Sequence, residues 1–91
     1  MPIDYEKFAP SRPLNDNERK AQKGFIFAII NKLGWTTDER HEKQRQLFGV
    51  ESFKDISQND AMLRAYSAYV NHVDQLEIAR TRAQTRTGLK V

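Results

Sequence analysis

The stretch Gln58–Ala83, QNDAMLRAYSAYVNHVDQLEIARTRA, decides the fold because it carries the most regular apolar pattern in the chain. Its large apolar side chains recur with steps of four, three, four and three residues, the spacing of one face of an α-helix. These positions are Met62, Tyr66, Tyr69, Val73 and Leu76. Such a helix is roughly 40 Å long at about 1.5 Å per residue, so its C-terminal end is predicted to protrude beyond a shorter partner.

The preceding segment predicts a helix from about residue 16 to Leu33. Asn15 followed by Glu18 is a capping signal at its start, and Gly34 is a stop signal after its end. Residues 25–30 are apolar throughout, so this helix is predicted to be either the central element of the fold or part of an interface. The side chains predicted to face the core share one side by their spacing: Ala21, Phe25, Ala28, Ile29 and Leu33.

A second helix is predicted to begin at the capping box formed by Thr36 and Glu39. It is short and polar, and it offers only Leu47 and Phe48 to a core. Gly49 is expected to end it, because glycine adopts the left-handed conformation that closes many helices.

A single helical turn is predicted at 52–56, and Ser57 with Asp60 indicates the start of the third long helix. A chain of 91 residues holds one small core. We therefore predict an all-α fold: a small three-helix bundle over residues 15–83, an extended N-terminal arm over residues 1–14 that contains all three prolines, and a basic tail over residues 84–91.

The positive charge is unevenly distributed along the chain. The formal net charge is +3, but residues 80–91 contain four basic and no acidic residues, whereas residues 1–79 contain 11 basic and 12 acidic residues. A basic segment of this kind attracts nucleic acid or an acidic protein surface through a salt-dependent term. The alternative interpretation is that the tail only keeps the protein in solution.

Several catalytic chemistries lack the residues they need. The chain has no cysteine, and its four glycines are never followed by the Lys-Ser or Lys-Thr of a phosphate-binding loop. His41 and His72 are 31 positions apart and do not show the ligand spacing of zinc sites. None of the four serines is paired in sequence with a credible base. We predict a non-catalytic protein without a metal site, a cofactor or a small-molecule substrate.

The sequence also predicts that no membrane is involved. No apolar run approaches the roughly 18 residues that a membrane-spanning helix needs. The first ten residues, MPIDYEKFAP, lack the basic and then apolar order of a signal peptide. A cytoplasmic location is expected by default.

Basic residues on the first two predicted helices and on the tail are candidates for contacts with nucleic acid, because such side chains can follow a phosphate backbone. The pattern leaves open whether that nucleic acid is single- or double-stranded. The candidate residues are Arg19, Lys20, Lys23, Arg40, Lys43, Arg80, Arg82 and Arg86, with Lys90 near the end of the tail.

A different set of residues predicts a protein partner or a second copy of the chain. Phe27 and Ile30 lie on the back of the first predicted helix, and Tyr66 belongs to the third. Together they would form an apolar surface containing a tyrosine, a residue type enriched at interface hot spots. The competing interpretation places Tyr66 in the core with its hydroxyl at the edge.

Short motifs recur at intervals along the stretch Phe25–Tyr66. They are Phe27-Ala28-Ile29, Gly34-Trp35, Phe48-Gly49-Val50, Ser52, Lys54-Asp55-Ile56 and Ser57. With these motifs the stretch resembles a small helical module of bacteriophage DNA-metabolism proteins. Similar modules occur at the ends of phage single-strand annealing and recombination proteins, and a looser likeness exists to GemA-type phage regulators. In this sequence no annealing or catalytic domain stands beside the module, and the third predicted helix continues into the basic tail.

The charge layout and the resemblance lead to one functional hypothesis and one alternative. The hypothesis is an accessory protein of phage or mobile-element DNA metabolism that binds nucleic acid electrostatically and a protein partner through a helical surface. The alternative is a protein-only interaction module, either a homo-oligomer or a small phage inhibitor of a host protein.

Overall fold

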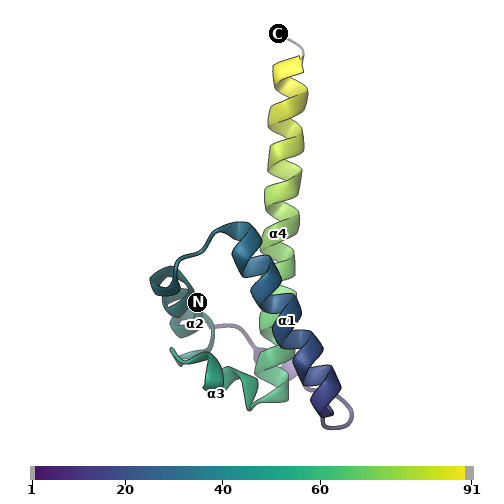
Figure 1. Cartoon of the computed structure of the whole chain (residues 1–91), viewed down its shortest axis with the longest axis vertical. Coiled ribbons are helices and arrows are strands. Elements are labelled where there is room, and N and C mark those ends of the chain that lie inside the picture. The colour runs from purple at the N-terminus through teal and green to yellow at the C-terminus, as the bar shows by residue number, and fades with distance from the viewer. Residues whose placement is uncertain (1, 90–91) are drawn as a thin grey trace.

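The computed structural model describes the backbone of residues 2–89 and the side chains of residues 2–82. Every regular element in this part of the chain is helical, which confirms the predicted all-α class. The three longer helices occur in the predicted order. The elements are η1 (Tyr5–Phe8, a 3-10 helix), α1 (Asp16–Leu33), α2 (Thr37–Phe48), α3 (Phe53–Ser57) and α4 (Asp60–Leu89) (Figure 1).

Local capping sets the ends of α1 and α2, as the sequence predicts. The Asn15 side chain accepts a hydrogen bond from the Glu18 amide at 2.8 Å, while the Glu18 carboxylate accepts one from the Asn15 amide at 3.0 Å. Thr36 begins α2 through a second capping box. Gly34 and Gly49 close the two helices with φ angles of 76° and 73°, which side chains with a Cβ atom rarely adopt.

The start of α4 differs from the prediction by its capping residue. Asn59 caps this helix, because its side-chain oxygen accepts a hydrogen bond from the Met62 amide at 3.1 Å. The predicted cap, Ser57, instead ends α3, where its hydroxyl donates to the Lys54 carbonyl at 2.9 Å.

Helices α1 and α4 run parallel and side by side along the body of the molecule (Figure 1). Two ion pairs fix their register, one near each end of the contact. Arg19 Nε lies 3.1 Å from Asp60 Oδ1, and Lys32 Nζ lies 3.1 Å from Asp74 Oδ1. A parallel pair needs a long connection to bring the chain back, and residues 34–59, with α2 and α3, provide it.

The face that α1 turns to the core agrees with the predicted one only in part. Ile29 is buried as predicted and Leu33 is half-buried, but Ile26 and Ile30 are buried as well. The other three predicted core residues, Ala21, Phe25 and Ala28, are exposed. The prediction was wrong because residues 25–30 are all apolar, so the pattern does not define a direction. The packing of this helix in the common core decides the direction instead, and the two ion pairs with α4 accompany that packing.

The core of α4 is likewise rotated from the predicted positions. The buried apolar residues are Leu63, Ala65, Tyr66 and Val70, and Asp74 continues the same face. Of the five predicted seam positions, Tyr66 is fully buried, three are half-buried and Leu76 is exposed. The seam therefore exists, but it lies about one position away from the predicted one.

One part of the N-terminal segment, Tyr5–Phe8, is helical instead of extended. It forms the helical turn η1 and packs on α4. The Ile3 amide donates to the Leu47 carbonyl at 3.0 Å, and the Tyr5 ring meets the Phe48 ring edge-on. Arg64 on α4 donates to the Phe8 carbonyl at 2.9 Å. Backbone and aromatic contacts thus join residues 3–8 to the body.

A buried polar network connects α2 to α4. The Gln44 side chain is fully buried, and its Oε1 atom accepts hydrogen bonds from the Tyr66 hydroxyl and from Arg40, both at 3.1 Å. Its amide group donates to the Glu51 carbonyl. Burial raises the pKa of Tyr66 far above its usual value, so this phenol is a permanent donor.

The C-terminal part of α4 extends beyond the rest of the fold (Figure 1). The register of the ion pairs places Leu33, the end of α1, level with about residue 75 of α4. The helix then continues to Leu89, so most of the predicted tail is helical in its backbone. The principal extents of 52, 26 and 21 Å reflect this overhang.

The Gln44 network gives a prediction for folding stability. Gln44→Met is expected to lower the free energy of unfolding by about 2–4 kcal/mol, because it leaves the Tyr66 hydroxyl and the Glu51 carbonyl without a partner. Tyr66→Phe is expected to cost about 1 kcal/mol. Urea titration should show that the double variant loses less than the sum. Additive losses would mean that the two side chains are not coupled.

A second prediction concerns acid sensitivity at the junction of α1 and α4. The Leu14 amide, and then Arg19, donate to Asp60 and lower the pKa of its carboxyl. The stabilisation from this carboxylate is therefore present above the ordinary pKa of about 3.9 and disappears as the pH falls through the lowered value. Compared with the parent, Asp60→Asn should be less stable at neutral pH and lose less stability on acidification.

Thermal melting at several pH values measures this difference. If the melting temperatures of the parent and of Asp60→Asn fall in parallel as the pH is lowered, the carboxylate does not contribute to acid sensitivity.

Candidate nucleic-acid interface

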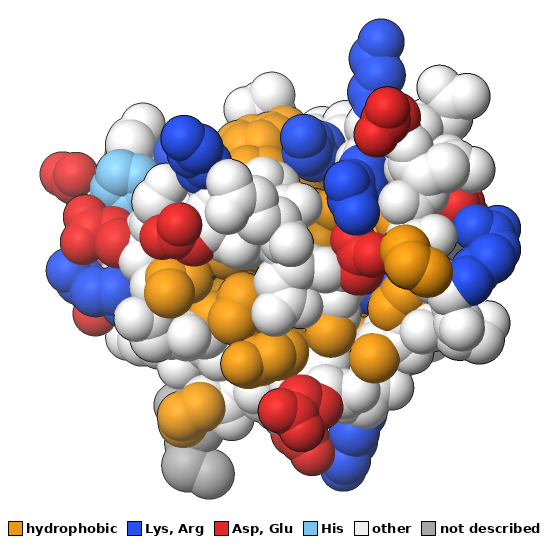
Figure 2. Space-filling model, turned by 90° about the horizontal axis from the view of Figure 1, so that it is seen from below, with side chains coloured by type: hydrophobic (Ala, Val, Ile, Leu, Met, Phe, Trp, Pro, Cys, Tyr) orange, Lys and Arg blue, Asp and Glu red, His pale blue; other side chains and the backbone are white. Residues whose placement is uncertain are grey.

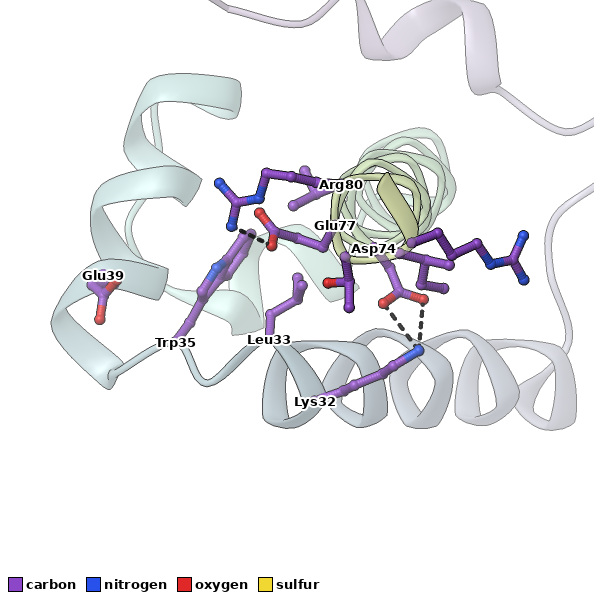
Figure 3. Close-up of a pocket in the computed structure, with 11 residues that line it drawn as sticks. Lys32, Leu33, Trp35, Glu39, Asp74, Glu77 and Arg80 are labelled. Carbon is purple, nitrogen blue, oxygen red and sulfur yellow. Dashed lines mark hydrogen bonds and ion pairs between the residues drawn. The ribbon is translucent and has the colours of Figure 1, made fainter. Parts of the chain in front are cut away.

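An open groove of about 580 Å³ lies where α4 leaves the body (Figure 3). The end of α1 and the turn after it form one wall, and α4 forms the other. Leu33 and Trp35 line the first wall, while Val73, Ile78 and Arg82 line the second. The groove exists because α1 ends at Gly34 while α4 continues.

Charges of both signs line this groove, and two of its three acidic residues, Asp74 and Glu77, are in ion pairs. Asp74 is only 7% exposed, and Lys32 neutralises it. Glu77 accepts a hydrogen bond from Arg80 at 2.7 Å, one turn further along α4 (Figure 3). The Glu77–Arg80 pair is exposed, so it is weak and easily exchanged for another partner. Arg82 is exposed as well.

Trp35 is the single tryptophan of the chain and lies half-buried at the edge of the groove (Figure 3). Lys43 on α2 places its ammonium group 5.4 Å from the centroid of the indole ring, a cation–π contact that covers one face. Lys43, predicted to contact nucleic acid, is therefore committed in part to the fold, yet it lies beside the groove.

Beyond the groove, residues 79–89 form the free end of α4. This segment, ARTRAQTRTGL, contains three arginines, no acidic residue and no aromatic residue. Arg80 and Arg82 are exposed. The side chain of Arg86 and all of Lys90, which were also predicted contacts, lie outside the described residues. The local charge is thus positive along a helix that no other element covers.

The remaining predicted nucleic-acid contacts do not join this free end. Arg19 pairs with Asp60, and Arg40 hydrogen-bonds to Gln44 while its guanidinium lies 5.4 Å from the Phe27 ring centroid. Both arginines therefore have structural roles that the charge pattern alone does not reveal.

Lys20 and Lys23 are exposed near the beginning of α1, at the opposite end of the body. The register of α1 on α4 places them about 25 Å from Arg80 and Arg82 along the helix axis. Figure 2 shows this end from below, where hydrophobic side chains gather towards the middle and basic and acidic side chains are intermixed around them. The predicted basic residues therefore form separate groups, and the free end of α4 is the group whose own segment contains no acidic residue. Its acidic neighbour Glu77, one turn before Arg80, pairs with that arginine.

The predicted apolar interface is mostly a part of the core. Tyr66 is fully buried and Ile30 is 3% exposed, so neither offers a surface to a partner. Phe27 is half-buried, and its ring centroid lies 4.7 Å from that of Phe53. The large apolar side chains that reach solvent are Phe25, at 43% exposure, and Leu76, at 57%. Sequence reasoning assigned both to the core because their spacing fitted a helix face.

The described residues contain neither a cluster of metal-binding side chains nor a membrane-spanning helix. Among them, no group of three or more histidine, aspartate or glutamate side chains has the geometry of a metal site. His41 approaches Glu51 at 3.4 Å, but no third ligand joins them. In the same part of the chain, no helix combines the length and apolarity needed to cross a bilayer.

Comparison with protein families, with curated proteins and with solved structures finds no match to this chain.

The free end of α4 gives a prediction for limited proteolysis. This segment extends beyond the other helices (Figure 1), so it opens at a lower free energy than the packed helices. Trypsin is expected to cut first after Arg80, Arg82 or Arg86, leaving a folded fragment that mass spectrometry identifies. Early cleavage within α1, at Lys20 or Lys23, would contradict the assignment of α4 as the unsupported element.

Proposed function

We propose that this protein is a non-catalytic nucleic-acid-binding accessory protein and that the free end of α4 is its contact element. The observation that carries the proposal is a helix that continues past its packing partners as a segment with basic but no acidic residues. Such a segment has little apolar surface to bury and strong attraction for a polyanion.

The energetics of a free helix support a binding role for this segment. A helix of this length is marginal in water when nothing packs on it, and polar residues on all sides leave it without a hydrophobic stripe. Phosphate oxygens placed beside Arg80 and Arg82 would neutralise their mutual repulsion and stabilise the helix. The ion pair between Arg80 and the Glu77 side chain is exposed, so Arg80 can readily exchange Glu77 for a phosphate group.

The resemblance of Phe25–Tyr66 to a module of phage DNA-metabolism proteins supports a place in the DNA metabolism of a mobile element. In this proposal the body anchors α4 and offers its surface to a protein partner. The free end of α4 then supplies the salt-dependent part of the affinity for nucleic acid.

A protein-only interaction module is the second candidate function. It is favoured by two exposed apolar side chains, Phe25 on α1 and Leu76 on α4. Phe25 lines a shallow depression with Gln22, whose Oε1 atom is buried without a hydrogen-bond partner among the described residues. A partner held there would bind by apolar burial and would resist high salt.

Two variants that remove the same charge test the nucleic-acid proposal. Arg80→Ala/Arg82→Ala and Lys20→Ala/Lys23→Ala each lower the formal net charge of +3 by two. The arginine variant is expected to bind labelled DNA about ten-fold or more weakly, with a salt slope smaller by about two. The lysine variant should change affinity by less than about two-fold. Its two sites lie farther from the free end of α4 than a Debye length of about 10 Å.

Fluorescence polarisation at 50 and 200 mM salt measures both effects, with thermal melting as the control for folding. Equal losses for the two variants would show that only net charge matters. Parent-like binding by the arginine variant, or no binding of DNA by the parent, would reject the proposal. Salt-resistant association with a protein partner would then favour the second candidate.

A further inference from the structure

The direction of the free end is fixed at its root. The Lys32–Asp74 pair and the buried side chains of α4 hold this helix against α1, one turn before the overhang begins. The backbone of α4 continues as a single helix from Asp60 to Leu89. Residues 79–89 therefore leave the body as a rod about 16 Å long.

The dimensions of this rod match one groove of nucleic acid. An α-helix with its side chains is about 10–12 Å across, and the major groove of B-DNA is about 12 Å wide and 8.5 Å deep. A-form RNA has a major groove too deep and narrow for side chains to read. The free end is long enough to cross the B-DNA groove between its two phosphate backbones.

The composition of the free end also distinguishes between nucleic acids. Proteins that bind single strands without sequence preference stack successive bases on aromatic side chains. Residues 79–89 contain no aromatic residue, and the nearest tryptophan, Trp35, already has Lys43 over one face of its ring. The segment instead contains arginine, threonine and glutamine, which donate hydrogen bonds to phosphates and to base edges.

We infer that the free end of α4 binds duplex DNA as an inserted helix in the major groove. This inference rests on the proposed function and adds to it the form of the nucleic acid and the conformation of the contact element. The body of the protein remains outside the DNA groove, because α1 and the turn at Trp35 end where the free end of α4 begins. Arg80 and Arg82, at the root of the overhang, then face the phosphates at the groove edge.

A proline substitution tests whether the segment binds as a helix. Thr85→Pro keeps every charge but removes a backbone donor and breaks the helix within the free end. The matched control is Thr85→Ala, which keeps the helix. The probes are a 20-base-pair DNA duplex, one of its strands alone and an RNA duplex of the same sequence. Circular dichroism and thermal melting check that the body stays folded in both variants.

The expected result is a loss of about ten-fold or more in affinity for the DNA duplex with Thr85→Pro and less than two-fold with Thr85→Ala. The parent should bind the DNA duplex at least several-fold more tightly than either other probe. A major-groove ligand, methyl green, should compete with the parent, and a minor-groove ligand, netropsin, should not.

The outcomes separate the two proposals. Parent-like affinity of Thr85→Pro, together with weak binding by Arg80→Ala/Arg82→Ala, would overturn the inserted helix while leaving electrostatic binding intact. Equal affinity of the parent for the three probes, or competition by netropsin alone, would overturn the major-groove assignment. Failure of the arginine variant to weaken binding would reject the proposed function itself.

Discussion

The parallel packing of α1 against the first half of α4 is the constraint on which the rest of the structure depends. Its register is set by two ion pairs, Arg19 with Asp60 and Lys32 with the buried Asp74. A buried carboxylate is costly without a partner, so this pairing penalises any other alignment of the two helices. Because α1 is much shorter than α4, the same register determines where the overhang begins.

The other elements complete the core on the remaining side of this pair. Helix α2 contributes Leu47 and Phe48, and Gln44 forms the polar link to Tyr66. The N-terminal segment then packs beside them through the contact of Tyr5 with Phe48. These contacts hold the body without using the C-terminal part of α4.

The fold separates the basic residues into groups with different roles. Arg19 and Arg40 stabilise the body, Lys20 and Lys23 lie near Asp16 and Arg19, and the segment of the free end of α4 has basic but no acidic residues. The proposed function follows from this separation rather than from the total charge. A near-neutral body with one charged helix concentrates its attraction for polyanions at one place.

The sequence by itself determined the local features of this protein: the helix ends at Asn15, Gly34 and Gly49, the all-α class and the excess of basic residues after Glu77. These depend on short-range hydrogen bonds, backbone conformation and composition. The tertiary structure decided which faces are buried, the parallel direction of α1 and α4, and the burial of Gln44 and Tyr66. An all-apolar run has no preferred side, so only contacts between distant segments could choose one.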